Sequence, residues 1–284
     1  MTKKLFLTLF TLAVAFSLTS KANAQEFYQQ CEALNSEGDP AAAVKKNLDA
    51  LKDKDAKVRA QAAHDLATAC DKRSVELLVS LLGDDDPKVR AAAVETLGRL
   101  GDRTAIDPLL EALYKEQNWD VKYVYGPALA SFQIYRASYA VLNSIANPQG
   151  EKVKTEPEMR ARCQAMLMVN QLRDVQFSRK AVNILFTYLD YEQPALRQLA
   201  EQTMTALKDT RNGGHELMGI LRQSHNPEYQ IKAAKWIGKL GIDDARDVLE
   251  ELANADAASI NPSVLKAVKE ALATLDKKQT AEKK

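Results

Sequence analysis

The sequence is short of the residues that β-proteins depend on. Aromatic residues make up only 6% of its 284 residues, glycine occurs 11 times, and no stretch alternates apolar and polar residues over the length of a strand. Alanine and leucine are abundant instead. Because β-sheets are enriched in aromatic and β-branched residues with alternating polarity, this composition argues against a sheet and favours an all-α protein.

Sequence motifs that mark catalysis or metal binding are also missing. The chain has no glycine-rich phosphate loop, no serine-nucleophile signature and no CxxC or HExxH spacing. Of its 3 histidines, only His215 is followed by a glutamate, and one such dipeptide cannot assemble a dinuclear metal centre. We therefore expect no enzyme activity, no cofactor and no metal.

Long apolar runs are absent apart from one near the N-terminus. Lys3 and Lys4 precede the apolar run 5–19, which is followed by the small residues of "ANA" ending at Ala24. This order is typical of a secretory signal peptide, and the run is shorter than the roughly 20 residues of a transmembrane helix. The sequence predicts a signal peptide over 1–24, a periplasmic or secreted location, and no membrane insertion after cleavage. An uncleaved N-terminal anchor is the alternative.

Neither sign of charge dominates the chain. It has 39 Lys and Arg against 38 Asp and Glu, a net charge of +1. Removal of 1–24 takes away three lysines and no acid, which leaves 36 basic and 38 acidic residues and a net charge of −2. Because a near-neutral protein has no overall field to attract nucleic acid, we expect no nucleic-acid partner.

Cysteine is scarce, and its number is odd for an oxidising compartment. The three residues are Cys31, Cys70 and Cys163. A disulfide between Cys31 and Cys70 would tie the N-terminal segment to the first repeat and leave Cys163 unpaired. Three buried thiols that behave as small apolar residues are the alternative, and the sequence leaves both open.

What the sequence does contain is an internal repeat. The stretch "DDDPKVRAAAVETLGRLGD" (84–102) has counterparts at 55–71 and 226–241. The residue after its "DPK" defines an anchor position that recurs every 31–38 residues, at Val58, Val89, Val121, Met159, Leu196, Tyr229 and Val264. Apolar residues recur eight and eleven positions after each anchor, with Asn170 as the exception. These offsets lie on one side of an α-helix, which we call the anchor helix.

A shorter outer helix is expected between successive anchor helices. Turn sequences rich in Gly, Asn, Asp and Pro separate the helices, and Asp86, Asn226 and Asn261 are expected to cap anchor helices. The outer helices are predicted at 74–82, 104–113, 181–189 and 244–252. Because one helical hairpin cannot bury its apolar side alone, neighbouring hairpins must stack.

This pattern predicts the fold and the organisation of the whole chain. We expect a right-handed α-solenoid of about seven helical hairpins over 40–275. A capping helix is expected at 25–39, before the first hairpin, and a polar tail at 276–284 that frays.

The stretch "DPKVRAAAVETLGRLGDRTAIDPLLEAL" (86–113) resembles HEAT repeats, in particular the HEAT-like repeats named after phycobilin lyases. Weaker units of the same kind cover most of the remaining chain. The resemblance implies an armadillo-like helical fold but no single function, because the family includes lyases, DNA-repair enzymes, hydroxylases and passive scaffolds. It also implies that the arginine after each anchor, as in Arg59 and Arg90, pairs with turn carboxylates and carbonyls of a neighbouring repeat. The available carboxylates are Asp55, Asp86 and Asp120.

The resemblance further implies that the anchor helices line the concave face of the solenoid. Positions 2, 6 and 10 after each anchor should then face solvent, and they are small and neutral in the middle repeats and cationic toward the C-terminus. The third repeat holds six aromatic residues within 119–139, has Pro127 inside its helix, and is followed by an inserted loop at 147–158. The proline is expected to bend this helix.

We predict a non-enzymatic scaffold that binds a protein or peptide partner through this face. Larger side chains that refill the space beside a bent helix are the packing alternative for the aromatic cluster. A small-ligand or enzymatic site near 119–139, or a structural part of an envelope complex, are alternative functions. The candidate partner-binding residues are Trp119, Tyr123, Tyr125, Tyr135, Ala161, Gln198, Gln202, Lys235 and Lys239.

Overall fold

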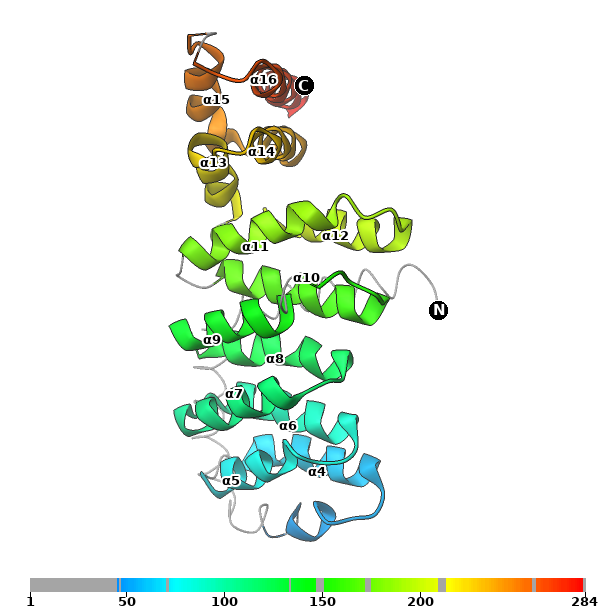
Figure 1. Ribbon diagram of the computed structural model, residues 1–284. Helices are drawn as coiled ribbons and strands as arrows, with labels where there is room; N and C mark the ends of the chain where they lie inside the picture. The colour runs from blue at the N-terminus through cyan, green and yellow to red at the C-terminus, as the bar shows by residue number, and fades with distance from the viewer. Residues whose placement is uncertain are drawn as a thin grey trace. The chain divides into compact units, whose positions relative to one another are not determined.

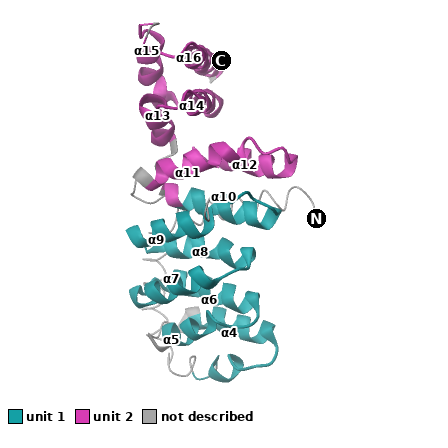
Figure 2. Ribbon diagram, viewed as in Figure 1, with its two compact units in different colours: residues 1–168 teal, residues 169–284 magenta. Residues whose placement is uncertain are grey.

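The computed structural model describes most of the chain from Lys45 onward, in two compact units. The units comprise residues 1–168 and 169–284 (Figure 2). The predicted signal peptide, the capping helix at 25–39, and Cys31 and Cys70 lie outside the described residues. The described residues are 45, 47–69, 72–132, 134–146, 151–171, 175–208, 213–256 and 259–282.

Unit 1 is a stack of helical hairpins in which anchor helices and outer helices alternate (Figure 1). Anchor helix α4 packs on α6, and α6 packs on α8, while the outer helices α5, α7 and α9 pack against the anchor helices. The α10 helix is the last of this unit and runs across the boundary at residue 168. The elements are α4 (Ala56–Ala69), α5 (Lys72–Leu81), α6 (Pro87–Leu100), the 3-10 turn η1 (Arg103–Ala105), α7 (Ile106–Lys115), α8 (Trp119–Ser131), α9 (Tyr135–Val141), the π-helical turn η2 (Leu142–Ala146) and α10 (Glu156–Gln171).

Unit 2 continues the same alternation. Outer helix α11 packs against α12 and α13, α13 packs against α14, and α14 lies alongside α16. The last helix includes residues 276–282, which were predicted to form a tail beyond it. The elements are α11 (Val175–Tyr188), α12 (Pro194–Leu207), α13 (Gly213–Gln223), α14 (Pro227–Leu240), the 3-10 turn η4 (Asp243–Ala245), α15 (Arg246–Ala253) and α16 (Pro262–Glu282).

The described residues confirm an all-α solenoid of helical hairpins and contain no strand. Each predicted anchor lies near the start of its own helix. These anchor helices are α4, α6, α8, α10, α12, α14 and α16. Most anchors and the apolar residues that follow them are buried, as Val89, Leu97 and Leu100 are in α6. The anchor Val58, in the first of these helices, is 38% exposed. The period of the sequence therefore sets the register of the core.

The predicted caps begin the anchor helices. The Asp86 side chain accepts a hydrogen bond from the amide of Lys88, and Asn226 and Asn261 cap α14 and α16 in the same way. A proline follows each of these caps, where an amide hydrogen would have no partner in the helix. Gly101 and Gly241 end α6 and α14 with φ angles of 63° and 68°, a conformation that glycine adopts without strain.

An arginine ladder joins successive turns in unit 1. Nε and Nη2 of Arg59 each donate a hydrogen bond of 2.8 Å to the carboxylate of Asp84. Nε and Nη2 of Arg90 donate to the carboxylate of Glu116 at 2.8 and 3.0 Å. In both residues Nη1 donates to two carbonyl oxygens of the turn before its own helix. Each arginine thus connects its own turn to the next one.

The ladder confirms the structural role expected for these arginines but corrects their partners. Asp55 and Asp86, which were expected to pair with them, instead accept hydrogen bonds from the amides of Lys57 and Lys88. The carboxylates that receive the arginines do belong to the next repeat, as the resemblance implies, but they are Asp84 and Glu116 and not Asp86 and Asp120. The hydrogen bond from Arg59 lowers the pKa of Asp84 below its ordinary value, and this outweighs the effect of burial.

One side of α12 differs from the corresponding sides of α6 and α14. Five and nine positions after the anchor, α6 has Val94 and Gly98 and α14 has Ala234 and Gly238, all of them buried. The same positions in α12 are Glu201 and Thr205, and both are exposed. The α12 helix therefore presents a polar flank where α6 and α14 present small apolar residues to a neighbouring helix.

Candidate functional site

The solvent-facing positions predicted for the anchor helices are accessible on α4 and α6. Glu95 and Arg99 of α6 are exposed, and Ala60, His64 and Ala91 are partly exposed. Apart from Glu95 and Arg99, all residues of α6 from Ala92 to Leu100 are buried, so the accessible strip is narrow. Side chains on this strip are the ones that a partner could reach without disturbing the core.

Glu95 shows that this strip is partly shielded from water. Burial raises the pKa of its carboxyl above the ordinary value, while the nearby charges of His64 and Arg99 lower it. The side chain is nevertheless exposed, so the shielding is incomplete. A group in such surroundings interacts more strongly with an approaching charge than a fully solvated group does.

The aromatic third repeat does not form one surface. Tyr123 and Trp119 are half-buried on α8. Tyr125, predicted to contact a partner, is 1% exposed and belongs to the core. It lies four positions after the anchor, an offset that points toward the core in every anchor helix. Tyr135 and Tyr139 are exposed, but on the outer helix α9. These aromatic residues are neighbours in the sequence and not on one face.

The ring of Trp119 lies close to two cations. The Lys122 ammonium nitrogen lies 4.4 Å from its ring centroid, and the Arg162 guanidinium carbon lies 5.5 Å from the same point. Arg162 is fully buried, pairs with Glu158, and donates a hydrogen bond to the Glu151 carbonyl oxygen at 2.8 Å. Burial lowers the pKa of Lys122. Trp119 therefore joins α8 to α10, and the α8 helix runs through Pro127 without a break.

The fourth repeat corrects the prediction for Ala161. Ala161, Ala165 and Val169 were expected to face solvent, and all three are buried. A Cβ atom on Gly126 would lie 3.7 Å from Cα of Ala165, which shows how closely α8 approaches this side of α10. Cys163 is buried on the same helix. The middle of α10 is therefore core on every side and offers no binding surface.

Unit 2 presents most of its predicted site residues to solvent. Gln198 of α12 is exposed and Gln202 is partly exposed. Lys235 and Lys239 of α14 are exposed, and the Lys239 ammonium nitrogen lies 4.1 Å from the ring centroid of Trp236. Lys266 and Glu270 of α16 continue this face. Lys266 was not among the predicted partner-binding residues, although it lies two positions after its anchor, an offset that predicts exposure.

No arrangement suited to metal chemistry is present among the described residues. They contain no group of three or more His, Cys, Asp and Glu side chains that could hold a metal ion. Glu216, which follows His215, is buried, and its carboxylate lies 3.3 Å from Nε of Arg179. Burial raises the pKa of Glu216, and the hydrogen bond from Arg179 acts in the opposite direction.

Comparison with known proteins identifies part of this array. Residues 44–130 match the family model of HEAT repeats, so the first hairpins are HEAT repeats. No curated protein matches the chain. Among the helices that the structure describes, none has the length and apolar composition that a membrane span requires.

Several solved structures resemble the chain at low identity. The complex of CpcE and CpcF of phycocyanin lyase from Nostoc sp. PCC7120 is 18% identical, with a TM-score of 0.43, covering 83% of this chain and 94% of that one. A HEAT-like repeat protein from the archaeon Thermococcus onnurineus NA1 is 15% identical, with a TM-score of 0.37, covering 77% and 93%. Human deoxyhypusine hydroxylase is 18% identical, with a TM-score of 0.30, covering 95% and 99%. Likenesses this distant carry no information about function.

Proposed function

We propose that this protein is a non-enzymatic scaffold that binds a protein or peptide through the solvent-facing positions of its anchor helices. The supporting observation is that these positions are exposed or partly exposed on each of the anchor helices α12, α14 and α16 of unit 2. Gln198 and Gln202 offer amide donors and acceptors, and Lys235 and Lys239 offer cations. In unit 1, Trp119 and Tyr123 contribute partly accessible aromatic surface.

Site-specific photo-crosslinking tests this proposal. A photoreactive amino acid placed at Gln198 or Lys235 should crosslink to a discrete partner in the envelope fraction of the native host. The same amino acid at Glu111 or Lys115, which are exposed on outer helix α7, serves as the control. Crosslinks at the α7 positions alone, or equal crosslinks at all four, would contradict a binding face on the anchor helices.

Ligand-induced melting shifts distinguish this function from a small-ligand or enzymatic site near 119–139. A scaffold should show no specific shift with metals or small molecules. A shift that disappears in the Tyr123→Ala variant would favour the small-ligand site. Tyr123 suits this test better than Tyr125, because its side chain is half-buried and not part of the core.

We further propose that the chain is exported and cleaved after Ala24, because the sequence of 1–24 has the order of a secretory signal peptide. The measurement is the mass of the protein purified from its native host. A mature chain that begins at Gln25 is expected. Recovery of the protein with Met1 and residues 2–24 intact would contradict cleavage.

A further inference from the structure

The anchor helices of unit 2 carry a group of exposed lysines. Lys235 and Lys239 lie one turn apart on α14, and Lys266 lies on the adjacent helix α16. We call these three residues the lysine face. The two helices pack closely, because a Cβ atom on Gly238 would lie 3.1 Å from Cα of Ala271. The three lysines are thus exposed on two helices that pack directly against each other.

Other cations of unit 2 form ion pairs that stabilise the fold. Lys232, on the same helix, pairs with Asp190 and Glu228 and donates a hydrogen bond to the Phe186 carbonyl oxygen at 3.2 Å. Arg246 pairs with Asp276 at 2.7 Å. Within the described part of the chain, no residue of the lysine face has an ion pair. Their charges are therefore available to a partner.

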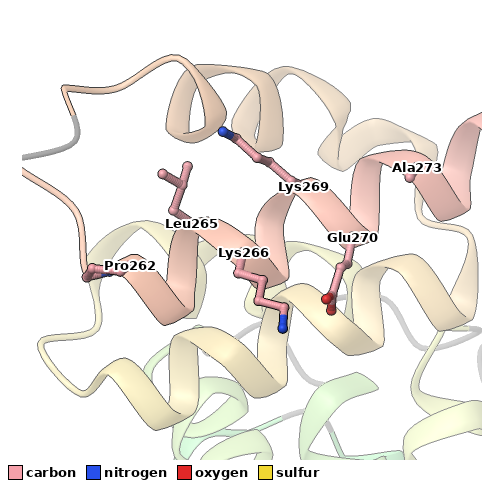
Figure 3. A pocket seen from close by; sticks show the side chains of 6 residues that line it. All are labelled: Pro262, Leu265, Lys266, Lys269, Glu270 and Ala273. Atoms are coloured by element: carbon pink, nitrogen blue, oxygen red, sulfur yellow. The ribbon is translucent and has the colours of Figure 1, made fainter.

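The local surroundings keep the lysine face positive. Lys235 and Lys239 are like charges four residues apart on a helix, an arrangement that costs stability. On α16, Glu270 is the carboxylate nearest the lysine face, one helical turn after Lys266. Figure 3 shows the side chains of Lys266 and Glu270 on the same side of α16. One carboxylate does not neutralise three ammonium groups.

A contact with an aromatic ring positions the cation of Lys239. Its ammonium nitrogen lies over the ring of Trp236, whose side chain is 8% exposed and fixed in the core. The backbone of Lys239 is tied to α16 as well, because its carbonyl oxygen accepts a hydrogen bond of 2.7 Å from Nζ of Lys278. A cation held over an aromatic ring loses less conformational freedom on binding an anion than a freely moving lysine does.

We infer that the lysine face binds an acidic segment of polypeptide in extended conformation. This inference deepens the proposed function and rests on it, because it names the chemistry of the partner at the same face. Residues four apart on a helix are separated by about 6 Å along its axis, close to the roughly 6.6 Å between alternate residues of an extended strand. Alternate acidic residues could therefore meet Lys235 and Lys239, and Lys266 on the next helix could meet another.

The surroundings of the lysine face favour a polypeptide over other polyanions. Phosphate backbones of nucleic acids are typically bound by more cations than three, and single strands also need exposed aromatic rings for base stacking. Ile231 lies at the start of the α14 row and is partly exposed, so it can contact an apolar side chain of a peptide. Lys266 and Lys269 also border an open hollow of about 480 Å³ on α16, with Leu265 and Ala273 on its wall (Figure 3).

Titration with a short fluorescent poly-glutamate peptide tests the inference on the full mature chain. The wild type should bind it, with affinity that falls as NaCl rises from about 50 to about 500 mM, because salt screens exposed charges. The Lys235→Glu/Lys239→Glu variant should bind about tenfold more weakly or not at all. The control is Lys88→Glu/Lys115→Glu, which makes the same change of charge in unit 1 and should bind like the wild type.

Each contrary result overturns the inference and leaves the proposed function to its own test. These results are no binding by the wild type, equal loss in both double variants, or equal binding of an oligonucleotide of the same charge. Crosslinking at Gln198 and Lys235 reports on partner binding without assuming that the partner is acidic. A partner that is crosslinked there but competed by no acidic peptide would support the scaffold and refute its acidic specificity.

Discussion

A methyl group on Gly98 would lie 2.6 Å from Cα of Ala128. The distance to Cβ of Ala128 would be 2.7 Å, so α6 and α8 approach each other almost backbone to backbone at this point. Glycine in the middle of a helix lowers the stability of that helix. At Gly98 the close packing of the two helices offsets this loss. The contact fixes the spacing of two anchor helices in unit 1.

Gly98→Ala should therefore destabilise the protein by roughly 1–3 kcal/mol, because the added atom meets backbone that cannot rotate away. Urea denaturation followed by circular dichroism measures this loss. Gly83→Ala is the matched control, since no heavy atom lies within 4 Å of the added group. A Gly98→Ala protein as stable as the Gly83→Ala protein would show that the two helices separate easily.

Glu116→Gln should lower the free energy of unfolding by roughly 1–3 kcal/mol at neutral pH, because the Arg90 guanidinium loses a charged partner. Burial raises the pKa of Glu116, but hydrogen bonds from Arg90 and two backbone amides outweigh it, and the pKa lies below its ordinary value. The carboxylate thus stabilises the fold above the ordinary pKa, and this contribution disappears as pH falls through the lowered value.

The difference in stability between wild type and Glu116→Gln should therefore narrow in acid. Unfolding in urea at a series of pH values between about 7 and about 3 measures it. Arg90→Lys offers a second variant, which keeps the charge but cannot make both hydrogen bonds to Glu116. A difference that stays constant over this range would mean that Glu116 acts through shape and not through charge.

Tyr125→Ala should cost roughly 3–5 kcal/mol, because its 1% exposed side chain leaves a large cavity in the core. Tyr123→Ala should cost clearly less, since that ring is half-buried. Thermal and chemical denaturation compare the two variants directly. Equal losses would place both rings in the core and remove Tyr123 from the candidate face.

Glu95→Gln should be more stable relative to the wild type at neutral pH than it is in acid. Burial raises the pKa of Glu95 in the folded state. As pH rises, the carboxyl therefore ionises in the unfolded chain before it ionises in the folded protein, and this favours the unfolded chain. The wild type loses stability through that window, and the glutamine variant does not. Side-chain NMR titration should find the Glu95 pKa above its ordinary value, and Arg99→Ala should raise it further. A pKa at or below the ordinary value would refute the shielding of this strip.

The repeat period in the sequence predicted the register of the fold. Anchors such as Val89 and Val121 lie at the start of their helices, and the caps Asp86 and Asn226 begin α6 and α14 as expected. These features are local, since helical periodicity, capping and turn chemistry depend on residues within a few positions of one another. The exposed positions of α6 and α14 follow from the same geometry.

The parts that the sequence did not predict depend on contacts between distant segments. Tyr125 was grouped with Tyr123 because they are close in the chain, although the helix turns them to different sides. Ala161 has the offset of an exposed residue, yet α10 is buried there. The partner of Arg90 in the next repeat is Glu116 and not Asp120, the aspartate expected from the resemblance. Offsets within one helix contain no information about what covers that helix.

The polar flank of α12 has a consequence for how such proteins grow. Glu201 and Thr205 occupy the positions at which α6 and α14 receive a neighbour on small apolar residues. Two side chains therefore distinguish this flank of α12 from the flanks on which α6 and α14 pack closely against a neighbour. Small apolar residues at positions 201 and 205 would replace the polar flank by an exposed apolar one, and such a surface favours self-association.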